Sequence, residues 1–246
     1  MVATVRDRRK LFVIRAAVTD RRYESCVAGS CSANYSPVTR TFLLSPAYAG
    51  GRRAQMILSE RAQFDLARRL RNSEPVSLGE VFTFLSGLYF RGKLAYANAF
   101  AQPKRDHSRV LVITPTRGLI PAATPVGLRD LREFAEVDID ENDPRYRRPL
   151  ERDARRLVRQ LSPECDVVLL GSVATGKYLS VLLDILKDRL RFPADFIGRG
   201  DMSRGGLLLR SAVDRTELQC IPVIGAVRKG KRPPKLEPRR YAPLSS

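Results

Sequence analysis

The sequence has few of the residues from which metal centres and disulfide scaffolds are built. Its four cysteines, Cys26, Cys31, Cys165 and Cys220, form no Cys-x-x-Cys pair, and its one histidine is His107. A structural zinc site needs four closely arranged cysteine or histidine ligands, and disulfide scaffolds belong to small secreted chains. We therefore expect free thiols in a reducing, cytoplasmic compartment, with no metal and no cofactor.

Long apolar runs are missing as well. A helix that spans a bilayer needs about 20 consecutive apolar residues. The most apolar region, from Val81 to Phe100, is interrupted by Arg91-Gly-Lys93. This region therefore predicts a buried helix rather than a membrane span, and we expect no membrane partner.

Acidic side chains are scarce at the two ends of the chain, where most of the net charge of +18 lies. Residues 1–40 carry 8 basic and 3 acidic side chains, and residues 226–246 carry 7 and 1. Residues 109–225, in contrast, are nearly neutral. Basic extensions bind polyanions weakly and without sequence preference, so they favour nucleic acid as a partner without defining the role of the folded part.

We predict three parts along the chain. Residues 1–40 form a flexible basic extension, because the apolar run Leu11–Ile14 is ended by Arg15 well before the length of a signal peptide. Residues 41–225 form one α/β domain. Residues 226–246 form a basic, proline-rich tail, whose composition favours disorder.

Apolar strand-like runs alternate with helical spacing through the predicted domain. This alternation predicts a mainly parallel sheet flanked by helices. A capping box from Ser77 to Glu80 predicts a helix start, and Gly92 predicts a break in that helix. Two segments, 207–209 and 220–224, remain open between strand and helix. Strands are predicted at residues 41–44, 109–114, 166–170 and 191–197, and a helix is predicted over residues 174–189.

Three loops rich in glycine and basic residues follow predicted strands. They are Ser45-Pro-Ala-Tyr-Ala-Gly-Gly-Arg-Arg-Ala54, Gly171-Ser-Val-Ala-Thr-Gly-Lys177 and Gly198-Arg-Gly-Asp-Met-Ser-Arg-Gly-Gly206. In open α/β sheets, ligands bind outside the carboxyl ends of the strands. Glycines let backbone N–H groups approach an anion, and helix N-termini add positive potential. The loops therefore predict an anion site.

The second loop matches the Gly-x-x-x-x-Gly-Lys pattern of phosphate-binding loops. The residue after Lys177 is Tyr178, where such loops place the Ser or Thr that ligates magnesium. This departure argues against a P-loop NTPase, and leaves contact of Lys177 with another anion as the preferred interpretation. Ser45 also ends a strand, but no Gly-x-Ser-x-Gly elbow surrounds it, which argues against serine-hydrolase chemistry.

The order of these motifs resembles that of the YaaA-like group of bacterial proteins, over roughly residues 40–215. The resemblance rests on a strand ending in Ser45-Pro-Ala47, a strand leading into Thr116-Arg-Gly-Leu119, and an apolar strand before Gly-x-x-x-x-Gly-Lys-Tyr. That group includes peroxide-stress proteins and relatives of tRNA-modification enzymes. The resemblance implies an α/β fold associated with DNA binding or nucleic-acid metabolism.

Together these features predict a protein that binds nucleic acid through its basic ends and through a cationic cleft built from the three loops. Asp201 would orient an arginine or, in an enzyme, act as the acid or base. The alternative is an enzyme acting on a small phosphorylated or nucleotide-like substrate at the same loops. The residues expected to bind the anion are Gly50, Gly51, Arg52, Arg53, Lys177, Arg199, Gly200, Ser203, Arg204 and Gly205.

Overall fold

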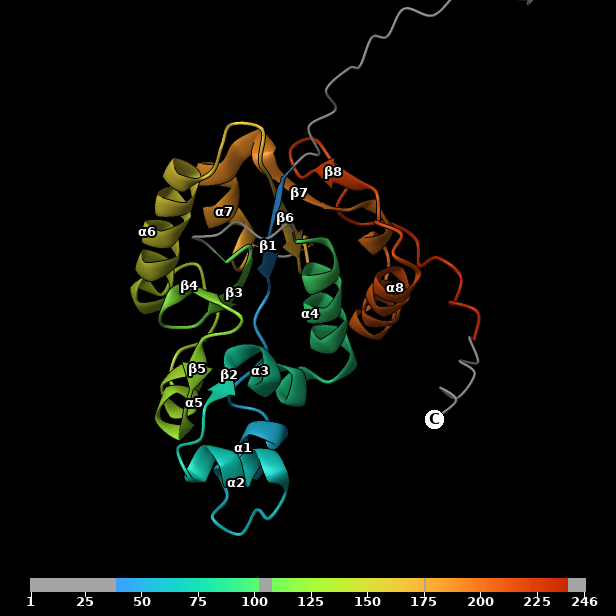
Figure 1. The fold of residues 1–246 in the computed structure, drawn as a ribbon. Coiled ribbons are helices and arrows are strands. Elements are labelled where there is room, and N and C mark those ends of the chain that lie inside the picture. The colour runs from blue at the N-terminus through green and yellow to red at the C-terminus, as the bar shows by residue number, and fades with distance from the viewer. Residues whose placement is uncertain (1–38, 102–107, 175, 239–246) are drawn as a thin grey trace, which may run out of the picture. The chain divides into compact units, whose positions relative to one another are not determined.

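Six strands form one sheet, in the spatial order β4-β3-β1-β6-β7-β8 (Figure 1). The computed structural model describes residues 39–101, 108–174 and 176–238. The four inner strands run parallel to one another, and the edge strands β4 and β8 run antiparallel to β3 and β7. The prediction of a mainly parallel α/β sheet is therefore confirmed. The strands are β1 Arg40–Leu44, β3 Val110–Thr114, β4 Gly118–Pro121, β6 Asp166–Leu170, β7 Leu190–Pro193 and β8 Cys220–Pro222.

Helices cover both faces of this sheet. Figure 1 shows α4 and α8 on one side of the sheet and α6 and α7 on the other. A separate small sheet pairs β2 (Val76–Ser77) with β5 (Pro125–Val126). The helices are α1 Arg52–Leu58, α2 Asp65–Arg71, α3 Leu78–Ser86, α4 Leu88–Phe100, α5 Leu128–Ala135, α6 Pro144–Gln160, α7 Leu179–Leu186 and α8 Asp201–Asp214.

The two central strands, β1 and β6, are buried on both faces, which explains why their sequences are continuous apolar runs. They pair in parallel with Leu44 opposite Leu170, and the Ser45 N–H donates to the Leu170 carbonyl at 3.1 Å. The first residues beyond the two strands, Ser45 and Gly171, are therefore adjacent. This register places the first two glycine loops at the same end of the sheet.

The break in the apolar helical region lies at Gly87, so the prediction of a break at Gly92 is wrong. Gly87 has φ +64°, a left-handed conformation that suits glycine, and it separates α3 from α4. Gly92 lies inside α4 and does not interrupt it. Its lack of a side chain lets α4 pack closely against α8. A Cβ on Gly92 would lie 2.5 Å from the carbonyl oxygen of Gly205 on α8.

The structure decides several of the local predictions made from the sequence. Ser77 caps α3 by accepting from the Glu80 N–H at 3.2 Å, but the Glu80 carboxylate pairs with Arg69 at 2.6 Å instead of reaching back. The segment 207–209 is helical within α8, and the segment 220–224 begins with strand β8. The helix expected over 174–189 is shorter, since α7 begins only at Leu179 and ends at Leu186.

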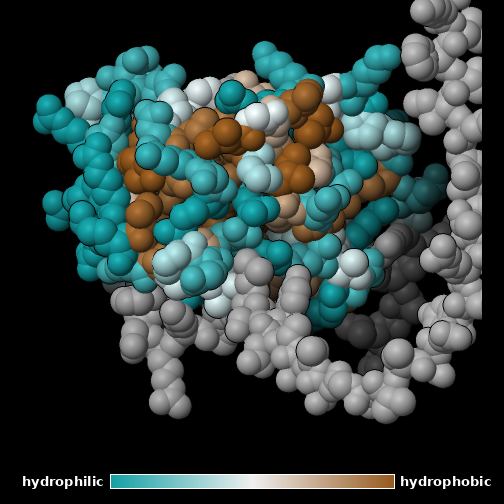
Figure 2. All heavy atoms as spheres, turned by 90° about the horizontal axis from the view of Figure 1, so that it is seen from above, coloured by the Kyte–Doolittle hydropathy of each residue, from teal (hydrophilic) through white to brown (hydrophobic). Residues whose placement is uncertain are grey.

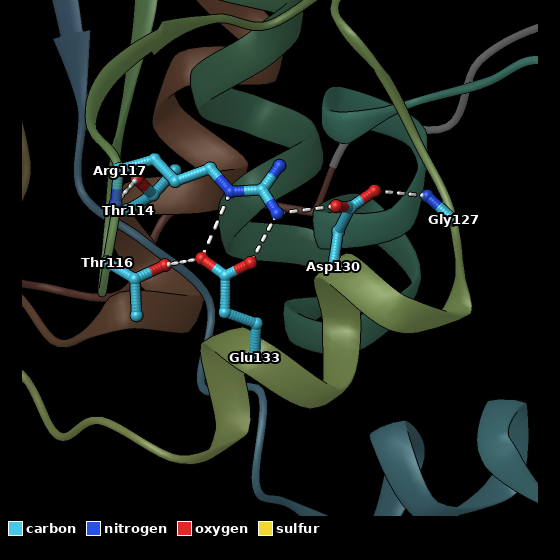
Figure 3. A network of polar contacts seen from close by, with 6 residues as sticks. All are labelled: Thr114, Thr116, Arg117, Gly127, Asp130 and Glu133. Atoms are coloured by element: carbon cyan, nitrogen blue, oxygen red, sulfur yellow. Dashed lines mark hydrogen bonds and ion pairs between the residues drawn. The ribbon is translucent and has the colours of Figure 1, made fainter.

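The Thr116-Arg-Gly-Leu119 motif forms the turn between β3 and β4 and anchors it to α5 (Figure 3). The Arg117 guanidinium donates to both carboxylate oxygens of Glu133 and, at 2.6 Å, to Asp130. Asp130 in turn accepts from the Gly127 N–H at 2.7 Å, before the first turn of α5. Arg117 also lies 5.5 Å over the ring of Phe134. Through Arg117, the motif therefore attaches the turn between β3 and β4 to α5, which is a structural role.

The start of the predicted tail, residues 226–238, has no helix or strand and lies against α8 and the loop before it. Arg199 donates to the Pro234 carbonyl at 3.4 Å, and a Cβ on Gly206 would be 3.5 Å from Leu236. The exposed basic residues of this segment are Arg228, Lys229, Lys231, Arg232 and Lys235. The predicted N-terminal extension up to residue 38, His107, Cys26 and Cys31 lie outside the described residues.

Figure 2 looks onto the end of the sheet from which β1 starts. Apolar side chains are visible there between hydrophilic ones. The glycine loops lie at the opposite end, where β1 and β6 finish.

Candidate functional site

Ser45, Gly171 and Tyr178 pack closely where β1 and β6 end. A Cβ on Gly171 would lie 2.8 Å from the Ser45 Cβ, 3.1 Å from its Oγ and 2.7 Å from the Tyr178 hydroxyl. Only glycine leaves room for these two side chains to meet in front of β6. The first glycine of the second loop is therefore needed for close packing.

Lys93, on α4, reaches this strand end from the side. Its ammonium group donates to the Ser45 carbonyl oxygen at 2.6 Å and to the Ser45 Oγ at 2.9 Å. The side chain is 1% exposed, and its nitrogen lies 4.5 Å over the ring of Tyr89 and 4.7 Å over that of Phe90. Helical spacing places Tyr89 and Lys93 one turn apart on the same face of α4.

Burial lowers the pKa of Lys93 from 10.5 to about 7, and the charge of Asp201 partly opposes this shift. Burial has this effect because a low-dielectric environment disfavours the ammonium form. Near neutral pH, Lys93 is therefore divided between a charged donor and a neutral amine. A neutral amine beside a hydroxyl is able to accept its proton.

Two tyrosines complete the interior of the site. The Tyr178 hydroxyl donates to the Ser172 carbonyl at 3.0 Å, and burial raises its pKa to about 12, so it stays protonated. The Tyr89 hydroxyl is buried near Arg204 and has no well-directed hydrogen bond among the described residues. Burial also raises the pKa of Tyr89. Both phenols are therefore neutral hydrogen-bonding groups at physiological pH.

A pocket of about 860 Å³ opens in front of these groups. Lys93 is not among the lining residues, whereas Ser45, to which it donates, is one of them. The lining residues come from the ends of β1 and β6 and from the starts of α1 and α8, together with neighbouring positions: Ser45, Pro46, Ala47, Tyr48, Gly51, Arg52, Arg53, Leu85, Ser86, Tyr89, Asp138, Ile139, Ser172, Lys177, Tyr178 and Asp201.

The charges of the pocket lie at its exposed parts. Arg52 and Lys177 are exposed and have no ion pair within the described residues. Arg53 is also exposed but donates to the Phe84 carbonyl at 3.0 Å. Asp138 and Asp201 supply the negative charge. The buried cations of the site are Lys93, which contacts Ser45, and Arg204, which pairs with Asp201 and lies near Tyr89 and Tyr178.

The structure thus brings the first and second loops into one pocket with one residue of the third, whereas the prediction was a cleft built from all three loops. Of the residues expected to bind an anion, Gly51, Arg52, Arg53 and Lys177 line the pocket, together with Asp201. Gly50 lies beside it, packed against the Tyr48 ring, whose hydroxyl would be 2.8 Å from an added Cβ.

The rest of the third loop is engaged elsewhere. Arg204 is 8% exposed, donates to the Phe196 carbonyl at 3.0 Å and pairs with Asp201 at 3.5 Å. Arg199 donates to Ser203 and to the tail, and Gly205 packs against the backbone of α4. Gly200 precedes α8 with open space around it. None of Arg199, Gly200, Ser203, Arg204 and Gly205 lines the pocket.

The Gly-Lys end of the second loop already holds a carboxylate of this chain. Ser180, in the first turn of α7, hydrogen-bonds to Glu141, and a Cβ on Gly176 would lie 2.5 Å from the same carboxylate. The position that a phosphate takes at a helix N-terminus is therefore filled by Glu141. This agrees with the interpretation that the loop is not a nucleotide-binding P-loop.

Sequence reasoning missed Lys93 and the two tyrosines. Lys93 lies on the face of α4 that also carries Tyr89, Tyr96 and Ala97, and a charged residue on such an apolar face is a signal for a buried, paired group. Its partner, Ser45, was identified as a strand end but not as the acceptor of a lysine. The sequence identifies Tyr178 as the residue that departs from the P-loop pattern and ends the Gly-x-x-x-x-Gly-Lys-Tyr motif, but not as a neighbour of Ser45, beside which it packs.

No group of three or more His, Cys, Asp or Glu side chains capable of holding a metal occurs in the described part of the chain. Within the same residues, no helix is long and apolar enough to cross a membrane. Comparison with family models, with curated proteins and with solved structures finds no match.

Proposed function

We propose that the pocket at the ends of β1 and β6 binds a small phosphorylated or nucleotide-like ligand, and that the protein is an enzyme acting on it. The observation that carries this proposal is the convergence of Arg52 and Lys177 on one cavity. These two cations come from different glycine loops, and neither has an ion pair within the described residues. Two free cations at one pocket favour a ligand with a compact negative charge.

The size and place of the pocket support a small ligand. Pockets for small molecules range over about 300–1,000 Å³, and in α/β sheets they lie outside the carboxyl ends of the strands. The volume of about 860 Å³ falls in that range. A nucleotide-sized molecule would place its phosphates near Arg52 and Lys177 and its uncharged part against Leu85, Ile139 and Tyr89.

The interior of the pocket favours chemistry over binding alone. Lys93 has its pKa lowered to about 7 and lies 2.9 Å from the Oγ of Ser45, a residue that lines the cavity. Burying a lysine in this way destabilises the fold, and such perturbed groups are typical of functional sites. Asp201 lines the same pocket and pairs with Arg204, which fits the predicted role of orienting an arginine.

Ligand binding is tested by equilibrium dialysis of the full chain against nucleoside mono-, di- and triphosphates, sugar phosphates and inorganic phosphate. The variant Arg52→Ala/Lys177→Ala should weaken binding about tenfold or more, because each exposed charge contact contributes up to about 1 kcal/mol. The control Arg61→Ala/Arg148→Ala removes two exposed arginines outside the pocket and should leave binding unchanged. Binding that the pocket variant leaves intact would refute the proposed site.

Nucleic-acid binding is the second candidate, and the exposed cations of residues 228–235 favour it. Five basic side chains in eight residues form a sequence-independent electrostatic surface, as phosphate backbones require. The resemblance to the YaaA-like group points in the same direction. Fluorescence anisotropy with single- and double-stranded DNA and RNA over a salt series tests it. Replacing four of these residues, Arg228, Lys229, Lys231 and Arg232, by Gln should flatten the salt slope, while Arg52→Ala/Lys177→Ala should not.

A further inference from the structure

We propose that Ser45 is a nucleophile and Lys93 its base, and that the pair attacks an uncharged acyl carbon, of an ester, thioester or amide, in the ligand that the pocket holds. The anionic character of that ligand rests on the proposed function; the reactivity of Ser45 does not. The proposal stands on the 2.9 Å contact between Lys93 and the Ser45 Oγ, and on the position of Ser45 in the pocket wall.

The placement of the two groups suits these roles. Ser45 lines the cavity, whereas Lys93 is sealed behind it by the rings of Tyr89 and Phe90. Ser45 is 7% exposed, so a ligand meets the pair through Ser45 and not through the buried amine. An amine in this position takes up and returns a proton and does not react with the ligand itself.

An acyl centre suits the surroundings of Ser45 better than a phosphoryl centre does. Beside its Oγ lie the backbone of Gly171 and the phenol of Tyr178, the free cations Arg52 and Lys177 are exposed, and the buried Arg204 is already paired with Asp201. A transferring phosphoryl group needs cations at the reacting atom, whereas an acyl carbon needs hydrogen-bond donors for one oxygen. The Tyr178 hydroxyl lies beside Ser45, and it would donate to that oxygen on turning away from the Ser172 carbonyl that now accepts its proton.

The proposed reaction balances without an oxidant or reductant. Ser45 Oγ bonds to the acyl carbon while its proton passes to neutral Lys93, and the leaving group departs with that proton. Water then attacks the acyl-serine, its proton passes to Lys93, and the Ser45 Oγ recovers a proton as the carboxylic acid product leaves. Serine–lysine pairs carry out this chemistry without histidine and on folds that lack the Gly-x-Ser-x-Gly elbow, so the missing elbow does not exclude it at Ser45.

The main alternative role for Lys93 is structural, because it also donates to the Ser45 carbonyl at the end of β1 at 2.6 Å. That contact alone would secure the strand end and leave the hydroxyl unreactive. The charged and titratable groups around the pair are Tyr89, Asp201, Arg204 and Tyr178. Only Asp201 among them acts directly on Lys93, favouring its charged form.

The test uses a fluorophosphonate probe on the full chain, with intact mass and peptide mapping as readouts. In this reaction the Ser45 Oγ bonds to phosphorus, fluoride leaves and the proton passes to Lys93. We expect one label, on Ser45, with a rate that rises about tenfold per pH unit below pH 7 and levels off above it, as neutral Lys93 accumulates. Ser45→Ala should abolish the label, and Ser86→Ala, at a serine of the same pocket without a lysine, should not.

Lys93→Met should slow labelling by about a hundredfold or more, while circular dichroism reports whether the variant is folded. If that variant does not fold, the pH dependence of the labelling rate in the unaltered chain decides whether Lys93 acts as the base. No label on Ser45, or a rate independent of pH from 5.5 to 8.5, would overturn the proposal. Arg61→Ala/Arg148→Ala, at exposed arginines outside the pocket, should keep the label. The label reports the reactivity of Ser45, and equilibrium dialysis reports the binding of phosphorylated ligands, so a failure of either proposal is recognised separately.

Discussion

Gly92 on α4 and Gly205 on α8 meet backbone to backbone where the two helices pack. A Cβ on Gly92 would lie 2.5 Å from the Gly205 carbonyl oxygen, and a Cβ on Gly205 would lie 2.8 Å from the carbonyl oxygen of Leu88. This close approach holds α4 against α8. Because Lys93 follows Gly92 directly, the packing of these helices also fixes where the lysine lies.

Gly205→Ala should therefore destabilise the protein, by about 1–3 kcal/mol, as overpacking of a tight interface does. The adjacent Gly206→Ala is the matched control, because its Cβ would meet only Leu236, at an ordinary 3.5 Å. Within a helix that control should stabilise by about 0.5–1 kcal/mol. Chemical denaturation of both variants measures the difference. Equal effects at the two positions would contradict the close packing.

Gly171→Ala should disturb the candidate site more than the fold. Its Cβ would lie 2.7 Å from the Tyr178 hydroxyl and 2.8 Å from the Ser45 Cβ, so one of the two side chains has to move. We expect labelling of Ser45 by the fluorophosphonate probe to fall at least about tenfold, since displacements near 1 Å have large effects on reactivity. Gly200→Ala, which meets nothing within 4 Å, should retain the label.

Much of the fold follows from local sequence patterns. β1 and β6 were predicted to within one residue because strands buried on both faces are uninterrupted apolar runs. The predicted break at Gly92 is wrong because a glycine in a helical region has two possible roles. It either adopts a backbone conformation that ends the helix or makes room for a neighbouring helix, and the local sequence does not distinguish the two. Gly87 is needed for its positive φ, whereas Gly92 is needed because the backbone of α8 lies against it.

The site was predicted only in part, for a related reason. The first two loops follow neighbouring parallel strands, so their meeting follows from strand order. The third loop follows β7, but a 3-10 helix, Ala194–Phe196, intervenes, and α8 then turns most of the loop toward α4 and the tail. The pairing of Lys93 with Ser45 joins residues 48 positions apart in the chain. Such a contact depends on the packing of α4 on the sheet, which no local pattern contains.

Glu133→Gln should lower the free energy of unfolding at neutral pH, because it removes the charge that pairs with Arg117. The loss should be only about 1 kcal/mol, since Arg117 is 39% exposed and solvent weakens the pair. Hydrogen bonds from Arg117 hold the pKa of Glu133 below its usual value. The native carboxylate therefore binds a proton less readily than the unfolded one. Its stabilisation is present above the unfolded pKa, near 4.3, and is lost as the pH falls through the lower folded pKa.

Urea denaturation at pH 7 and at pH 3 measures this loss, with Arg132→Ala, an exposed arginine on the same helix, as the control. The stability gap between the unaltered chain and Glu133→Gln should narrow at pH 3. A gap of the same size at both pH values would show that the Glu133 charge does not contribute.

Lys93 should make stability rise with pH in the alkaline range. Its pKa is about 7 in the folded protein and 10.5 without burial, so between these values the unfolded chain binds a proton that the folded chain does not. The free energy of unfolding then increases with pH, by up to about 1.4 kcal/mol per pH unit from this one group. Below pH 7 both states are protonated, and the full cost of burying the charge remains.

Lys93→Met should remove this slope whatever its effect on absolute stability through the lost contact to the Ser45 carbonyl. The measurement compares urea unfolding of the two chains at pH 6, 7, 7.5 and 9. We expect the stability of the unaltered chain to rise, relative to the variant, from pH 7.5 to pH 9 and to stay level from pH 6 to about pH 7. Lys177→Met, at an exposed lysine of the same pocket, should keep the slope of the unaltered chain. A parallel pH dependence of the unaltered chain and Lys93→Met would mean that Lys93 stays charged in the fold, and a lysine that stays charged is unable to take the proton of Ser45.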